Sequence, residues 1–90
     1  MEIELLKFQV TPPDRTQEFI KADSEVWTPW LRQQRGFLRK TYQEYPNGMV
    51  HIRIFWASKR DWNKAASSPE LPATEVKMRA AFLGVYTRTP

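Results

Sequence analysis

The sequence contains no cysteine among its 90 residues, and it has only one histidine. Without cysteine the chain cannot form a disulfide, present a thiolate nucleophile or bind a metal through sulfur. The single histidine has no second histidine or carboxylate at a ligand spacing, which argues against a metal site. No cofactor motif is recognisable either. We therefore predict that the protein holds no metal and no other cofactor.

Long apolar runs are also missing. No stretch approaches the roughly 18 apolar residues of a membrane span, and the opening MEIELLKFQV is acidic and alternating instead of basic and then apolar. We expect a cytoplasmic protein with no membrane partner. The formal charge of +4 comes from 14 basic and 10 acidic residues spread along the chain, so it points only weakly to nucleic acid or an acidic ligand.

What is present is ordinary globular composition, with 41% hydrophobic and 27% charged residues. A chain of this length can form only one core, so residues 1–90 are predicted to be a single domain. Such a domain buries only about 60–65% of the surface that its unfolded chain exposes. An interface with a second copy would therefore add useful stability.

Hydrophobic patterning predicts the order βαββαβ. Alternation indicates strands over residues 3–10, 37–45, 49–56 and 85–88, and the pair Asn47-Gly48 is typical of a tight hairpin. Apolar spacing of three and four predicts a helix from about residue 14 to 34, and the second helix is expected in two pieces, after Ser58 and from Pro72. The fold class is therefore α+β, ferredoxin-like, with an antiparallel four-stranded sheet.

Helix ends carry their own signals. Asp14 with Gln17, and Ser58 with Asp61, match the capping box that opens a helix. Pro29 deletes one amide donor, so we expect a kink or a broken final turn there, with Gly36 as the stop. In the last helix, three residues are predicted to face inward: Met78, Ala81 and Phe82.

The helices should cover one face of the sheet. That face would carry Leu6, Phe8, Val50, Ile52, Ile54 and Trp56, and the other face Leu5, Lys7, His51, Arg53 and Phe55. The second set is too apolar for water and too charged for a dry core. A sheet covered by a partner sheet around a wet cavity would have this composition.

Three segments carry a family resemblance: DSEVWTP at residues 23–29, Gly36-Phe37-Leu38, and the strand end Arg53-Ile54-Phe55-Trp56. Together with the element order, they resemble a group of uncharacterised cyanobacterial proteins similar to the dimeric α/β-barrel superfamily, which is named after the antibiotic biosynthesis monooxygenases. The resemblance implies a homodimer. The superfamily includes cofactor-independent monooxygenases, dehydratases and haem-degrading enzymes. The Asn, Trp and His set of the haem degraders cannot be placed here, which counts against haem degradation.

Asp23 and His51 are the candidate catalytic residues. Asp23 falls on the apolar stripe of the first helix, where burial would make it a candidate general acid or base; alternatively it is held by a backbone amide or by Arg53. His51 is the one side chain that ordinarily titrates near neutral pH, and with Arg53 it could bind an anionic or phenolic substrate. Alternatively, His51 is an interface residue.

Aromatic residues supply the candidate ligand pocket. Four tryptophans (Trp27, Trp30, Trp56 and Trp62) could line a pocket for a flat aromatic compound, or could simply pack the core. Tyr42 adds a possible hydroxyl donor. We predict a pocket between sheet and helices built from Asp23, Trp27, His51, Arg53 and Trp56.

A basic group lies where the first helix ends and the next strand begins: Arg32, Arg35, Arg39 and Lys40. The helix dipole favours cations there, which we prefer as the explanation. RNA recognition motifs share the βαββαβ order, but residues 47–54 have Met49 and His51 where their signature has aromatics, so nucleic-acid binding is a minor hypothesis. The leading hypothesis is a protein that binds or transforms a small aromatic or carbonyl compound. The alternative is a non-catalytic ligand-binding or assembly domain.

Overall fold

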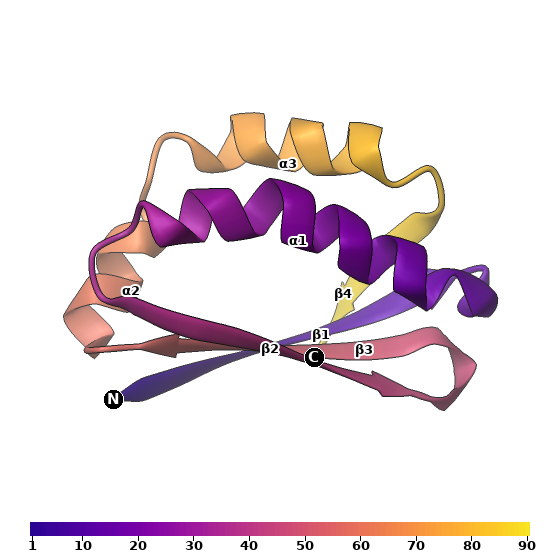
Figure 1. Ribbon diagram of the computed structural model, residues 1–90, viewed down its shortest axis with the longest axis horizontal. Helices are drawn as coiled ribbons and strands as arrows, with labels where there is room; N and C mark the ends of the chain where they lie inside the picture. The colour runs from indigo at the N-terminus through magenta and orange to yellow at the C-terminus, as the bar shows by residue number, and fades with distance from the viewer.

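Four antiparallel strands form one sheet, and the helices lie on one face of it (Figure 1). The computed structural model describes all 90 residues. The strands are β1 (Glu2–Thr11), β2 (Phe37–Tyr45), β3 (Met49–Trp56) and β4 (Val85–Thr89), and the helices are α1 (Thr16–Arg32), α2 (Lys59–Ala66) and α3 (Leu71–Ala81). The predicted α+β, ferredoxin-like order βαββαβ is confirmed, with the second helix in two pieces.

The strand order is β2-β3-β1-β4, so the first and last strands of the chain lie side by side. In the β1–β4 pair Lys7 is opposite Thr89, and in the β1–β3 pair Lys7 is opposite His51. Helices α1 and α3 run next to each other above the sheet, while the shorter α2 lies beside one end of it (Figure 1). None of the helices combines the length and the apolar character needed to cross a membrane.

The predicted hairpin joins β2 to β3. Asn47 has φ +66° and Gly48 has φ +83°, so both residues of the Asn-Gly pair are in the left-handed region. A Cβ atom on Gly48 would lie 2.5 Å from the carbonyl oxygen of Val10. The turn is therefore closed against the end of β1, and this position requires glycine.

The core lies between the sheet and the helix layer, as predicted. Its largest fully buried side chains come from two strands and two helices: Val10, Phe19, Val50, Ile52, Trp56 and Met78. Phe82, expected to face inward, is also buried, but Ala81 is exposed. Because α3 ends at Ala81, the chain leaves the helical spacing there, and Phe82 reaches the core from extended backbone.

The predicted side-chain cap of α1 and the predicted broken final turn at Pro29 are wrong. A short 3₁₀ turn over Pro13–Arg15 precedes the helix, so Asp14 is not at its first position and α1 begins without a side-chain cap. The helix also continues through Pro29 to Arg32, because Pro29 lies on the exposed side while Leu31 beyond it is buried in the core. In contrast, the cap of α2 is confirmed: the amide of Asp61 donates to Ser58 Oγ at 3.1 Å.

Candidate functional site

A cavity of about 620 Å³ lies between the sheet and the three helices. It is lined by 21 residues, 14 of them hydrophobic. All four tryptophans of the chain are among them: Trp27 and Trp30 on α1, Trp56 on β3 and Trp62 on α2. Ligand pockets in proteins typically measure about 300–1,000 Å³ and have mostly apolar walls with a few polar groups. The cavity has the size and lining that a flat organic ligand requires.

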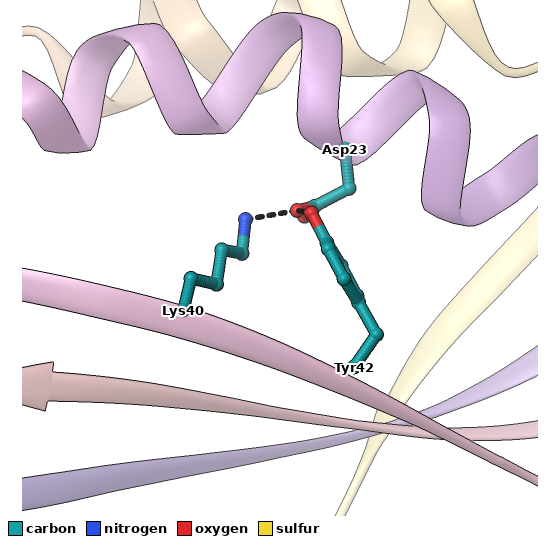
Figure 2. A network of polar contacts seen from close by, with 3 residues as sticks. All are labelled: Asp23, Lys40 and Tyr42. Atoms are coloured by element: carbon teal, nitrogen blue, oxygen red, sulfur yellow. Dashed lines mark hydrogen bonds and ion pairs between the residues drawn. The ribbon is translucent and has the colours of Figure 1, made fainter.

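A network of three polar side chains (Figure 2) includes two that line this cavity, Asp23 and Lys40, and a third, Tyr42, that is partly buried. Asp23 projects from α1 toward β2, and its carboxylate oxygen Oδ1 accepts a hydrogen bond from Lys40 Nζ and another, of 2.5 Å, from the Tyr42 hydroxyl. Neither donor reaches Oδ2. Both Asp23 and Lys40 line the cavity, and their side chains are only 7% and 5% exposed. The network is a buried ion pair with one carboxylate oxygen left free of both donors.

An irregularity in β2 lies directly before Lys40 and allows Phe37 and Lys40 to face the helices together. Phe37 is opposite Trp56, but Arg39, two residues later, is opposite the next residue, Phe55. Leu38 is therefore the extra residue of a β-bulge and is 53% exposed. After the bulge, Lys40 is opposite Ile54 and faces the helices. Residues 37 and 40 are an odd number of positions apart, so without the bulge they could not both face the helices.

Burial changes the proton affinities of both donors. It lowers the pKa of the Lys40 ammonium, and the attraction of the Asp23 carboxylate opposes this shift without cancelling it. Burial and the neighbouring Asp23 carboxylate together raise the pKa of the Tyr42 phenol well above its ordinary value. Tyr42 therefore keeps its proton across the physiological range, and Lys40 releases its proton more readily than a lysine in water.

Other polar groups of the cavity are largely paired. Trp56 Nε1 donates to Glu4 at 3.0 Å, and Glu75 accepts from the Tyr86 hydroxyl at 2.7 Å and from Arg79. Trp30 Nε1 is buried and has no hydrogen-bond partner. Three of the residues that line the cavity were not predicted as site residues from the sequence: Glu4, Lys40 and Glu75. The inward alternation of Ile52 and Ile54, extended across the hairpin to β2, was the signal that could have found Lys40.

His51 and Arg53 lie on the other face of the sheet. They are opposite Lys7 and Leu5 of β1, and neither lines the cavity. The prediction of one pocket that combines them with Asp23 and Trp56 is wrong, because residues 51 and 56 are an odd number of positions apart on a regular strand and point to opposite faces. Arg53 is consequently not the partner of Asp23; it donates to Gln43 at 3.1 Å.

On that outer face, the ring of Tyr45 packs against His51 at 4.4 Å between centroids. Desolvation and the nearby positive charges of Lys7 and Arg53 lower the pKa of His51. Its Nδ1 atom is buried and has no hydrogen-bond partner. His51 is therefore a mainly neutral imidazole with an unsatisfied nitrogen at physiological pH.

The basic group after α1 does not act as a unit. Lys40 is buried in the cavity, which corrects its assignment to the helix dipole, and the guanidinium of Arg39 lies 4.3 Å from the centre of the Phe55 ring. Phe55 is only 8% exposed. The outer face therefore presents no open phenylalanine on which a base could stack. Nor do any three histidine, aspartate or glutamate side chains gather as a metal ion would require.

Comparison with known proteins identifies the fold. No family model matches the chain, and no curated protein matches it significantly. Among solved structures, a cofactor-independent oxygenase of Streptomyces nogalater is 16% identical with a TM-score of 0.69, over 98% of this chain and 89% of its own. A monooxygenase of Streptomyces coelicolor in complex with nanaomycin D is 20% identical with a TM-score of 0.69, over 97% and 81%.

A third similar structure is a dimeric ferredoxin-like protein from an uncultured marine organism. It is 18% identical, with a TM-score of 0.66, over 97% of this chain and 87% of its own. Other matches include proteins provisionally assigned as antibiotic biosynthesis monooxygenases. At these identities the likeness shows that the chain has the ferredoxin-like fold of such proteins, and it transfers no activity.

Proposed function

We propose that this protein belongs to the dimeric α/β-barrel superfamily and binds a small aromatic or carbonyl compound in the cavity between sheet and helices. The observation that carries the proposal is the combination of four tryptophans with one buried carboxylate in a cavity of about 620 Å³. The narrower resemblance to cyanobacterial proteins and a cytoplasmic location are parts of the same proposal.

The reaction that this arrangement supports is proton abstraction from the bound compound. Asp23 is the base, because Oδ2 is free of both hydrogen-bond donors while Oδ1 is fixed by them. The Lys40 ammonium, next to the same carboxylate, stabilises the anion that forms. An electron-rich anion of this kind reacts with dioxygen, as in a cofactor-independent monooxygenase.

A second copy of the chain is the proposed partner. The outer face carries Ile3 and Leu5, which are 48% and 41% exposed, and the same face carries His51 with its unsatisfied nitrogen. A partner sheet would cover the apolar side chains and could supply an acceptor or donor to His51. His51 and Arg53 are then interface residues, and a catalytic role for His51 would require a cavity between the two sheets.

The binding part of the proposal can be tested by tryptophan fluorescence, because all four tryptophans line the cavity. We expect 2-tetralone, a flat ketone with acidic α-protons, to quench the emission, and naphthols to do so as well. Asp23→Asn should weaken naphthol binding by about tenfold or more, since it removes a charged acceptor for the ligand hydroxyl. His51→Gln is the matched control and should leave quenching unchanged.

Catalysis is separated from binding by following the exchange of α-protons of 2-tetralone for deuterium by NMR. An enzyme should accelerate the exchange, and Asp23→Asn should abolish the acceleration. Quenching without exchange would favour the alternative, a non-catalytic ligand-binding domain. In that case the ion pair of Asp23 and Lys40 would belong to the fold and to ligand binding, and would take no part in a reaction. Absence of quenching by every flat compound would contradict the proposal as a whole.

A further inference from the structure

We infer that Lys40 is a nucleophilic amine that forms an imine with a ketone or aldehyde bound in the cavity. The inference rests on the proposed function of the same site and narrows its substrates to carbonyl compounds. It assigns Lys40 a covalent role in place of the purely electrostatic one. Lys40 lies in the cavity wall, its amine is buried, and Asp23 and Tyr42 lie beside it.

The position of Lys40 differs from that of most lysines in the chain. Its side chain is 5% exposed and lines an otherwise mainly apolar cavity. Four other lysines are exposed: Lys21, Lys59, Lys64 and Lys77. Only the neutral amine is nucleophilic, and burial favours that form, which lowers the pKa of Lys40. A carbonyl carbon inside the cavity would therefore meet a neutral, nucleophilic amine more often than it would at an exposed lysine.

Asp23 supplies the proton acceptor that the reaction needs. The Lys40 ammonium already donates to Asp23 Oδ1, so its proton has a direct path to the carboxylate. Tyr42 donates to the same oxygen at 2.5 Å and holds the carboxylate in position from the other side. The three groups correspond to a nucleophile, a base and an orienting donor.

The step balances without an oxidant or reductant. The Lys40 nitrogen attacks the carbonyl carbon, and as the C–N bond forms, a proton passes from nitrogen to the carbonyl oxygen through Asp23, which gives a carbinolamine. The C–O bond then breaks with a second proton transfer, and water leaves as the C=N bond forms. A protonated imine withdraws electrons from the neighbouring carbon, so that an α-proton becomes easier for Asp23 to remove. This links the covalent step to the proposed proton abstraction.

Reductive trapping tests the inference on the unmodified protein. We use 2-naphthaldehyde as probe, because it is flat, cannot be deprotonated next to its carbonyl, and gives a stable secondary amine when cyanoborohydride reduces its imine. Peptide mass spectrometry then locates the adduct. We expect it predominantly on Lys40, with a yield that rises with pH in step with the neutral amine, and we expect competition from 2-tetralone.

Two variants complete the experiment. Lys40→Arg keeps the cation and should lose the adduct, whereas Lys21→Arg, which alters an exposed lysine on α1, should keep it. An adduct spread over the exposed lysines of the unmodified chain would overturn the inference, whether or not Lys40→Arg folds. Fluorescence quenching by 2-naphthaldehyde with no adduct on Lys40 would also overturn it and leave the proposed function standing. No quenching by any flat compound would remove both.

Discussion

At the scale of single residues, the ion pair of Asp23 and Lys40 is the feature with the largest energetic consequences. Two charges taken out of water stabilise a fold only weakly as a pair, because desolvation offsets most of their attraction. Removal of one partner leaves the other charge buried and uncompensated, which costs about 3–5 kcal/mol. A network of this kind is therefore a weak means of stabilisation, and its presence beside a cavity favours a role in chemistry.

Tyr42→Phe tests the third member of the network. The variant should be less stable by about 1–2 kcal/mol near neutral pH, because it loses a hydrogen bond to a charged acceptor. The folded state raises the pKa of this phenol above its ordinary value of 10.0, so the unfolded chain releases the proton first. The stabilisation is present below pH 10.0 and is lost as the pH rises further.

Urea unfolding of both proteins from about pH 8 to about pH 11 measures this difference. The gap in unfolding free energy between the wild type and Tyr42→Phe should narrow at the alkaline end. Tyr45→Phe, an exposed position on the same strand, is the control and should show no such narrowing. A constant gap over the whole range would argue that Tyr42 makes no buried hydrogen bond with Asp23.

Sequence patterns identify Asp23 more directly than its partner Lys40. An acid on an apolar helical stripe stands out in the sequence, and the structure places Asp23 in the cavity wall. Lys40 was missed because regular alternation from Phe37 places its side chain on the outer face, whereas alternation from the hairpin, where Tyr42 is opposite Ile52, places it on the inner face. His51 drew attention as the one histidine, but residue type carries no information about which face of a strand a side chain takes.

At the scale of elements, the hairpin between β2 and β3 concentrates the backbone constraints. Gly48→Ala should destabilise the protein by about 2–3 kcal/mol. The alanine would have to keep the positive φ of Gly48. Its Cβ atom would lie 2.5 Å from the Val10 oxygen and 2.9 Å from Pro13 Cα. Both neighbours are backbone atoms, so a side-chain rotation cannot relieve the clash. Thermal and urea unfolding would measure the loss.

Asn47→Gly is the matched substitution at the preceding residue. Asn47 also has positive φ, which glycine adopts without strain, so we expect stability to change by no more than about 0.5 kcal/mol. Equal destabilisation by the two variants would mean that the turn geometry is not the cause. If Gly48→Ala left the free energy of unfolding unchanged, β1 and the hairpin would have to move apart at little cost.

Elements specified by local signals were predictable, and those that depend on contacts were not. The Asn-Gly turn and the Ser58 cap each act over four residues or fewer, and both are present. The start of α1 was misjudged because the 3₁₀ turn at Pro13–Arg15 takes the residues of the expected cap. Pro29 was expected to disturb the helix, but burial of Leu31 outweighs one missing amide bond.

At the scale of the whole molecule, the uncovered sheet face is the main open surface. It combines exposed Ile3 and Leu5 with the partly buried His51 and Arg53. Sequence alternation was enough to assign these residues to one face, because regular strands obey a period of two. What covers the face cannot follow from alternation, since solvent, ligand and a partner sheet all tolerate a mixed composition.

The proposed homodimer can be tested by sedimentation of the 10.7 kDa chain. The wild type should sediment as a dimer, and Leu5→Glu should shift it toward the monomer by burying a charge at the centre of the interface. Val76→Glu is the matched control, because Val76 is 68% exposed on α3 and belongs to the helix layer. A monomeric wild type, or equal effects of both substitutions, would contradict the face-to-face dimer.

The bulge at Leu38 also has a consequence for how such a site can change during evolution. Deletion of the Leu38 codon would restore regular alternation from Phe37 and leave Lys40 facing the cavity. Deletion of the Thr41 codon, with Tyr42 held in place, would turn Lys40 to the outer face. A single codon gained or lost in β2 can therefore remove the amine from the cavity, or restore it, while the lysine itself remains in the gene.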